Sequence, residues 1–447
     1  MSYDVVVIGG GFAGLSAAAA LSDAGARVLV LEARPALGGR ASAFTDPATG
    51  ETVDNGQHLM LGCYHETLAF LARIGASGNV EIQRSLEVAF VDEAGRRSTL
   101  SCPPLPSPLH LFAGLAEWGA LRLGDRLSAL SLASPLRRAR RFLESGKGVL
   151  PASDGETVES WLVRNGQSRR LREMLWGPLA LAALNQPADE AAAPVFVRVL
   201  AQMFGPDPKD SAVAMPLRPL DALYAEPARE FIVARGGEIR VSYPARVRVG
   251  DERVAWVDAR GERVEAGSVI VAVPWFALTE TITGDTRPVE GLLSASRAAV
   301  ASPIVTVNLW FDRSVLPAPF VGLPGRVFQW VFDKRQVFGD SASHLSCVSS
   351  GASAVVAQSN EILAARARSE LASALPSADG AELLRSVVVR ERRATFSLAP
   401  GQPRRPDTKT AVRGLLLAGD WVDTGLPATI EGAVVSGHRA ARMADRL

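Results

Sequence analysis

A glycine-rich turn close to the amino terminus constrains the fold of this chain more than any other feature. Gly9, Gly11 and Gly14 follow a β-branched run, Val5 to Ile8, and open an Ala-rich stretch typical of a helix. A second apolar run, Arg27 to Leu31, completes the spacing of a β-α-β unit. In such a turn the first glycine permits the bend, the second lets the backbone approach a pyrophosphate, and the third lets the helix pack closely on the sheet. The sequence therefore predicts a Rossmann-type dinucleotide-binding domain.

An acidic residue stands where such a domain needs one. Glu32 ends the second predicted strand, 21 residues after Gly11, where a carboxylate accepts hydrogen bonds from ribose hydroxyls. The helix after the turn presents free N–H groups and the positive end of its dipole to a phosphate. Because the strands, the helix and Glu32 are in register, we expect a bound dinucleotide.

The chain has 447 residues and a formal net charge of +1. At roughly 150 residues a domain, this length predicts two or three domains, and the charge excludes the large positive field that collects nucleic acid. Cys63, Cys102 and Cys347 form no C-x-x-C pair, which favours a reducing cytoplasm over a disulfide framework. We expect no signal peptide, and no uncharged apolar stretch reaches the length of about 18 residues that a membrane-spanning helix needs.

The loop from Glu32 to Arg40 contains two adjoining glycines, Gly38 and Gly39. Two glycines allow backbone N–H groups to face an anion, and Arg40 can pair with it. The loop resembles the glycine doublet of the flavoprotein superfamily that includes the amine oxidases and the phytoene desaturases. In that superfamily the doublet lies along the pyrophosphate of FAD, so the resemblance implies FAD as the cofactor.

The C-terminal segment resembles the part of that superfamily that closes the FAD site. A predicted strand, Leu415 to Ala418, runs into Gly419 and Asp420, and a predicted helix begins at Thr429. The resemblance implies that Asp420 bonds the ribityl chain and that the helix N-terminus faces the N1/C2=O edge of the flavin. Since no cysteine lies near this motif, we expect FAD to be bound noncovalently.

A third element agrees with this resemblance. It consists of Gly236-Gly237, Arg246 to Val249 and Val269 to Pro274, which are similar to the strands that cover the adenine side in this superfamily, and a backbone contact is expected near Val247. The residues expected to bind FAD are Gly9, Gly11, Phe12, Ala13, Gly14, Glu32, Ala33, Arg34, Gly38, Gly39, Arg40, Asn55, Gly56, Val247, Gly419, Asp420, Ile430, Glu431 and Ala433.

The predicted fold class is α/β with an α+β substrate domain: a Rossmann-type FAD-binding domain with an inserted mixed sheet-and-helix substrate domain. We expect the FAD-binding domain to be discontinuous, over residues 1–90, 230–285 and 395–447. The substrate-binding domain is expected over residues 91–229 and 286–394.

Two segments narrow the resemblance. The stretch from Val53 to Tyr64, with its Asp-Asn-Gly-Gln-His run, and the region from Trp176 to Asn185 resemble the squalene-associated FAD-dependent desaturases, the hydroxysqualene dehydroxylases of bacterial hopanoid pathways. The segment from Gly425 to Ala433 agrees, and the resemblance covers essentially the whole chain. It implies reduction of the allylic alcohol hydroxysqualene to squalene, with reduced FAD as the electron source.

This chemistry needs an acid that protonates the leaving oxygen and an apolar tunnel that shields an allylic cation from water. Asp54 and His58 are the first candidates for the acid, since their loop is expected to return toward the flavin and histidine titrates near neutrality. Tyr64 is a third. For each, a turn or packing role is the alternative. The expected substrate contacts, for which ordinary packing is the alternative, are Trp176, Asn185, Trp310, Trp330 and Phe332.

Residues 103–142 predict a peripheral membrane contact. Apolar residues recur at mostly helical spacing from Leu109 to Leu121 and include Trp118, a residue common at membrane interfaces. Arg137, Arg138, Arg140 and Arg141 then offer charges to anionic headgroups. We expect a cytoplasmic protein on the inner face of the cell membrane; the alternative is a buried helix with a solvated basic end.

Three other functions remain open at this point: a carotenoid or phytoene-type desaturase, a flavin amine oxidase, and a flavin-binding protein without turnover. The amine oxidase is disfavoured because Trp421 is the only aromatic residue in the C-terminal motif. The expected partner is a polyprenoid lipid. The histidines show no metal-ligand spacing, so no metal is expected.

Overall fold

The computed structural model describes residues 3–339 and 343–444 and has a five-stranded parallel sheet in the order β10-β2-β1-β14-β21. These strands are β10 (Glu238–Arg240), β2 (Val28–Leu31), β1 (Tyr3–Ile8), β14 (Ala266–Val271) and β21 (Leu415–Leu417). The inner strands are unbroken apolar runs because parallel sheets are covered on both faces. The Rossmann-type α/β fold predicted from the sequence is confirmed.

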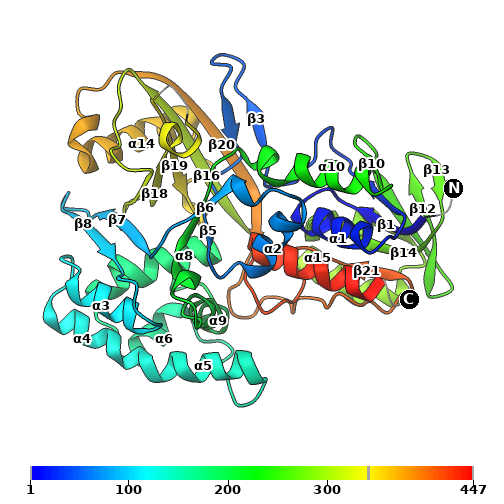
Figure 1. The fold of residues 1–447 in the computed structure, drawn as a ribbon, viewed down its shortest axis with the longest axis horizontal. Helices are drawn as coiled ribbons and strands as arrows, with labels where there is room; N and C mark the ends of the chain where they lie inside the picture. The colour runs from blue at the N-terminus through cyan, green and yellow to red at the C-terminus, as the bar shows by residue number, and fades with distance from the viewer. Residues whose placement is uncertain (1–2, 340–342, 445–447) are drawn as a thin grey trace.

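Helices α1 (Phe12–Asp23) and α15 (Ile430–Ala444) pack side by side, with α10 (Glu226–Ala234) beyond α1 (Figure 1). Gly437 makes the close approach of α1 and α15 feasible, because a Cβ at this position would overlap the carbonyl oxygen of Ala13. The first and last motifs of the sequence thereby meet at one end of the parallel sheet.

A four-stranded sheet lies next to the parallel sheet in the order β13-β12-β11-β15. Its strands are β13 (Glu262–Val264), β12 (Arg253–Ala259), β11 (Ala245–Gly250) and β15 (Ile282–Gly284), with α11 (Leu278–Thr281) and α12 (Glu290–Ala298) following in this part of the chain. The alternating buried and exposed residues of β11 are typical of a sheet covered on one face.

The largest sheet has seven strands in the order β20-β16-β19-β18-β17-β7-β8. They are β20 (Leu383–Phe396), β16 (Ala301–Phe311), β19 (Ser343–Ser349), β18 (Trp330–Asp333), β17 (Phe320–Gly322), β7 (Glu87–Val91) and β8 (Arg97–Ser101); α14 (Asn360–Ala374) packs on β16 and β20, and α13 (Lys334–Phe338) follows β18. The predicted domain boundary at residue 90 falls inside β7.

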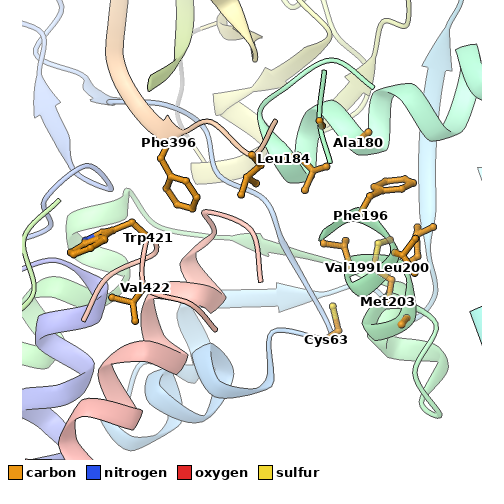
Figure 2. Packing of buried hydrophobic residues seen from close by; sticks show 14 of the residues in the cluster. Cys63, Ala180, Leu184, Phe196, Val199, Leu200, Met203, Phe396, Trp421 and Val422 are labelled. Carbon is orange, nitrogen blue, oxygen red and sulfur yellow. The ribbon is translucent and has the colours of Figure 1, made fainter. Parts of the chain in front are cut away.

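A group of helices lies on the other side of β7 and β8, at the end of the molecule away from the two termini (Figure 1). They are α3 (Leu109–Glu117), α4 (Leu123–Ala129), α5 (Ala133–Ser145), α6 (Val158–Arg164), α7 (Arg169–Leu171), α8 (Gly177–Leu184) and α9 (Ala193–Met203). A π-helical turn, Arg172–Trp176, leads into α8. The buried cluster drawn in Figure 2 runs from Trp421 and Val422 of the C-terminal segment to Leu200 and Met203 of α9.

Short elements join these parts. They are the pair β3 (Ala43–Thr45) and β4 (Thr52–Asp54), the three-stranded sheet of β5 (Met60–Leu61), β9 (Val213–Pro216) and β6 (Val80–Ile82), and α2 (His65–Arg73). In the described part of the chain, no helix has the length and apolarity that crossing a membrane requires. Over the same residues, no group of three or more His, Cys, Asp or Glu side chains is arranged to hold a metal ion.

Candidate active site

A cavity of about 790 Å³ opens at the carboxyl ends of the parallel strands. This volume lies in the upper part of the range of roughly 300–1,000 Å³ that is usual for ligand sites. The predicted residues that line it are Gly9, Gly11, Phe12, Ala13, Glu32, Ala33, Arg34, Gly38, Gly39, Arg40, Asn55, Gly56, Gly419, Asp420, Ile430 and Ala433. Segments from both ends of the chain therefore line a single cavity, which we call the cofactor cavity.

The two glycine motifs contact each other and together form one part of the wall of this cavity. A Cβ on Gly39 would lie 3.5 Å from the Cα of Gly11, and Gly9 has a φ of +112°, a conformation that favours glycine. Gly11 precedes α1 and has no side chain with which to satisfy the first N–H groups of the helix. The cradle therefore presents backbone donors and a helix N-terminus, which suit a pyrophosphate.

Glu32 joins the first glycine turn to the loop after β2. One carboxylate oxygen accepts the N–H of Gly10 at 2.7 Å, and the other accepts the N–H of Arg34 at 2.8 Å. The side chain is buried yet lines the cofactor cavity. A carboxylate has about four lone-pair sites, so Glu32 retains capacity for ribose hydroxyls while it holds both loops.

Arg40 and Asp420 join the second glycine loop to the C-terminal turn. The Arg40 Nη2 donates to the Asp420 Oδ1 at 2.6 Å, and Nη1 donates to the carbonyl of Ala394 at 2.6 Å. The guanidinium also lies 5.7 Å from the ring centre of Trp275. Since both charged groups line the cavity, they are placed to bind different polar parts of one dinucleotide.

The amino end of α15 forms another part of the cavity wall. Thr429 accepts the N–H of Gly432 at 3.1 Å and so caps this helix, whose first residue Ile430 lines the cavity. Trp421 faces elsewhere: it is buried, and its Nε1 donates to the carbonyl of Val273 at 2.8 Å. Among the described residues, the C-terminal motif therefore places no aromatic wall in the cofactor cavity.

A smaller cavity of about 210 Å³, the apolar cavity, adjoins the cofactor cavity. Its wall is mostly aliphatic and aromatic and comes from α3, α8, α9 and the seven-stranded sheet. Cys63 and Met203, drawn in Figure 2, belong to it. The residues that line both cavities are Gln57, Leu59, Tyr64, Ala182, Ala183, Val348, Ser350 and Thr429. An apolar ligand in this cavity lies directly beside a ligand of the cofactor cavity.

His58 lines the cofactor cavity. Its Nδ1 lies 2.6 Å from the carbonyl oxygen of Gly56, which requires a proton on Nδ1. Burial lowers the pKa of His58, against the opposing effect of the Gly56 carbonyl, so the ring is neutral near pH 7 and its Nε2 is an acceptor. This geometry favours a hydrogen-bond acceptor over the acid expected from the sequence.

Asp54 does not face either cavity. It is 2% exposed, and its carboxylate accepts from Lys334 Nζ at 2.7 Å and from the N–H of Leu220 at 3.1 Å. Lys334 also donates to the Oε1 of Gln57. Because β4 turns this aspartate into the core toward Lys334, Asp54 cannot touch a reacting atom, and the expectation of an acid at Asp54 is corrected.

Tyr64 lies at the junction of the two cavities, beside the hydroxyl of Thr429. Burial raises the pKa of the Tyr64 phenol, and the nearby thiol of Cys63 and carboxylate of Glu431 act in the same direction. The hydroxyl is therefore protonated at neutral pH, which suits a neutral hydrogen-bond donor.

The predicted substrate contacts divide into two groups. Trp176, Trp330 and Phe332 line the apolar cavity. Trp310 lies away from both cavities, where it stacks on His344 with ring centres 4.1 Å apart, so the expected contact there is replaced by packing. Asn185 lines the cofactor cavity, but its amide is bonded to Ser302, Thr395 and Gly351 and holds the C-terminal cap of α8.

Three predicted FAD contacts lie outside the cofactor cavity. Gly14 packs on the Gly9 carbonyl, which a Cβ would overlap, and Val247 is buried in β11. The carboxylate of Glu431 accepts the N–H groups of Glu66 and Thr67 at 3.0 and 2.9 Å, and its side chain borders the apolar cavity instead. Further residues line the cofactor cavity that no sequence motif indicated, among them Gln57, Arg246, Asp258, Arg260 and Glu391.

Comparison with known proteins agrees with the fold and with FAD as the cofactor. The sequence pattern of the family described as flavin containing amine oxidoreductase matches residues 12–444. The hydroxysqualene dehydroxylase of Rhodopseudomonas palustris is 32% identical over 450 residues, covering 99% of this chain and 98% of that protein. The zeta-carotene desaturase of Solanum lycopersicum is 24% identical, covering 98% and 80%. An oxidoreductase of Methanosarcina mazei shares the fold, with a TM-score of 0.76 at 19% identity over 99% and 100% of the two chains.

Proposed function

The chain belongs to the flavin containing amine oxidoreductases and, within them, to the hydroxysqualene dehydroxylases, and from this premise we propose that it reduces hydroxysqualene to squalene with FAD. The observation that carries the proposal is the apolar cavity that shares eight lining residues with the cofactor cavity. A hydrocarbon chain fits such a wall, and the shared residues bring it against the cofactor.

The cofactor cavity fits FAD in three respects. Gly9, Gly11 and the start of α1 form a cradle for pyrophosphate, Glu32 stands at the ribose position, and Asp420 lines the same cavity beside Arg40. Arg246 and Arg260 line the end beside β11, where an adenosine would lie. Bound and reduced FAD supplies the two electrons and the hydrogen that replace the hydroxyl group.

The protein's own residues exclude water and orient the substrate. The overall change replaces a C–O bond with a C–H bond and releases water, and an electron-poor allylic carbon on this route must be kept from solvent. The apolar cavity, with Trp176, Trp330 and Phe332 in its wall, provides that shield. His58 adds a neutral acceptor at the cofactor cavity.

Product analysis tests the proposal. The FAD-loaded protein, reduced under anaerobic conditions, is incubated with hydroxysqualene, and the oxidised protein is incubated with phytoene. Squalene in the first reaction and unchanged phytoene in the second are expected. Desaturated phytoene together with unreacted hydroxysqualene would instead favour a carotenoid desaturase, to which the chain is also similar.

We also propose a peripheral contact with the cytoplasmic face of the cell membrane, through a different surface from that expected. Trp118 is 1% exposed and packs on Phe90, with ring centres 5.3 Å apart, so it cannot reach a membrane. Leu111, Leu115 and Leu121 are buried as well. The expected apolar face of α3 is therefore part of the core, and Leu111 lines the apolar cavity.

Exposed leucines on α3, α4 and the segments beside them support this contact. They are Leu105, Leu109, Leu123, Leu127 and Leu130, each between 40% and 70% exposed. Arg137, Arg138 and Arg141 of α5 are exposed nearby in sequence and are suited to anionic headgroups. A lipid substrate would then reach the apolar cavity from the bilayer, since α3 borders both the leucines and the cavity.

A further inference from the structure

The junction between the two cavities combines apolar walls with a few polar groups. Four of the eight shared lining residues are polar: Gln57, Tyr64, Ser350 and Thr429. The hydroxyl of Thr429 is already engaged, because it lies 3.3 Å from the Pro427 carbonyl, accepts the N–H of Gly432 and is hydrogen-bonded to the phenol of Tyr64. A hydrocarbon needs no polar group at this point, whereas these side chains can hydrogen-bond a polar group of a ligand at the junction.

The orientation of the Gln57 amide follows from its contact with Lys334. An ammonium group has donors and no acceptor, so the atom of Gln57 that it contacts is the carbonyl oxygen Oε1. The amide nitrogen Nε2 therefore points away from Lys334. Since Gln57 lines both cavities, this nitrogen offers N–H donors to a ligand at the junction.

The charge behind Gln57 strengthens that donor. Lys334 and Asp54 form an ion pair in which both side chains are at most 2% exposed. A cation bonded to the carbonyl oxygen draws electron density from the amide and makes its N–H groups better donors. The carboxylate of Asp54 balances the charge, which makes the buried lysine tolerable.

We propose that the amide of Gln57 and the hydroxyl of Tyr64 form the subsite for the hydroxyl group of the substrate, with Lys334 and Asp54 as positioning residues. This inference rests on the proposed function and deepens it. Two neutral donors at the junction hold the oxygen of the alcohol beside the cofactor cavity. Partial negative charge that develops on the departing oxygen is stabilised by the same donors.

The subsite predicts a difference between two ligands that differ by one hydroxyl group. The dissociation constants of hydroxysqualene and squalene are measured for the oxidised, FAD-loaded protein in detergent, by the quenching of tryptophan fluorescence. Wild type is expected to bind hydroxysqualene about tenfold more tightly than squalene. Tyr64→Phe and Gln57→Glu are each expected to reduce this ratio about fivefold and to leave the affinity for squalene unchanged.

Gln57→Glu retains an oxygen for Lys334 and removes the N–H donor. Tyr243→Phe is the matched control, because it removes a phenolic hydroxyl outside both cavities, and it should keep the wild-type ratio. The double variant Asp54→Asn/Lys334→Met, which removes both charges of the ion pair, should lower the ratio with squalene affinity intact. A merely structural role of the pair would change the two affinities together.

The outcomes separate the subsite from the proposed function. Wild-type ratios in both Tyr64→Phe and Gln57→Glu would overturn the subsite, even if the protein converts hydroxysqualene to squalene. The subsite would also be contradicted if the wild-type protein bound hydroxysqualene and squalene with nearly equal dissociation constants. Absence of squalene formation by the reduced wild type, with a clear preference for the alcohol in binding, would contradict the proposed reaction and leave the subsite supported.

Discussion

The guanidinium of Arg40 donates to the carboxylate of Asp420 at 2.6 Å and so joins two loops that lie 380 residues apart in the chain. Both groups line the cofactor cavity. We therefore expect Asp420→Ala to weaken FAD binding at least tenfold, since it removes a cavity carboxylate and leaves Arg40 unpaired. Titration of the apoprotein with FAD, followed by flavin fluorescence, measures the loss. The exposed Asp379→Ala serves as control, and equal affinity in the two variants would contradict the role of Asp420.

The position of Glu32 in the cofactor cavity leads us to expect that the bound cofactor is FAD and that Glu32 helps to retain it. Its carboxylate holds Gly10 and Arg34, and only a dinucleotide brings an adenosine ribose to this position. We expect heat-released cofactor to be FAD, and Glu32→Ala to retain several-fold less of it after dialysis. Chromatography of the released flavin checks both statements; FMN in the wild type would contradict the assignment.

The buried ion pair predicts a large loss of stability from one substitution and a smaller loss from two. Lys334→Met leaves the Asp54 carboxylate buried without its cation, which costs about 3–5 kcal/mol. Asp54→Asn/Lys334→Met removes both charges and should recover most of that loss. Urea unfolding of the three proteins measures the free energies. A double variant no more stable than Lys334→Met would show that the charge pairing is not the cause.

His344 predicts a dependence of stability on pH. It lies against Trp310 and Asn308, and burial lowers its pKa from 6.5 to about 3, with a smaller contribution from Lys334. The unfolded chain thus binds a proton that the folded chain excludes, and stability falls as the pH drops below 6.5. At pH 5 this one group costs about 2 kcal/mol. His344→Gln should lose that much less stability between pH 7 and pH 5, and equal losses in both proteins would contradict the prediction.

Vesicle co-sedimentation tests the membrane surface. Replacing Arg137, Arg138, Arg140 and Arg141 with Gln should weaken binding to anionic vesicles at least tenfold at low salt, since each charge contributes about 1 kcal/mol near the surface. Leu123→Ser/Leu127→Ser should weaken binding to neutral vesicles too. The buried Trp118→Phe is the matched control, with unchanged binding. If neither the wild type nor any variant sediments with vesicles, the proposed membrane contact is contradicted.

The cofactor site could be predicted from the sequence because its determinants are local. The turn from Gly9 to Gly14 and the Gly38–Gly39 pair need glycine because of positive φ angles or close backbone contacts, and such positions are visible in a short sequence motif. The predicted fold, family and FAD cofactor are confirmed. The role of Asp54 could not be predicted, since its partner Lys334 lies 280 residues away in a segment without a motif.

The apolar residues of α3 that were expected to contact a membrane are mostly buried, and this could not be predicted for a related reason. Helix α3 is apolar on most sides, and periodicity alone does not tell which apolar side the rest of the fold covers. Leu109 is exposed while Leu111 and Leu115 are buried. Gln57, in contrast, belongs to the same run as His58, and it could have been found by asking which side chains return from the pyrophosphate loop toward the flavin.

Anaerobic flavin spectroscopy shows whether reduced FAD in this protein gives its electrons to hydroxysqualene. The FAD-loaded protein is reduced chemically, and hydroxysqualene is added in stoichiometric amount while the flavin absorbance is recorded. We expect the absorbance of oxidised flavin to return at a rate that depends on the concentration of hydroxysqualene, and about one squalene to form for each flavin reoxidised. A flavin that stays reduced in the presence of hydroxysqualene, with the alcohol recovered unchanged, would contradict the proposed reaction.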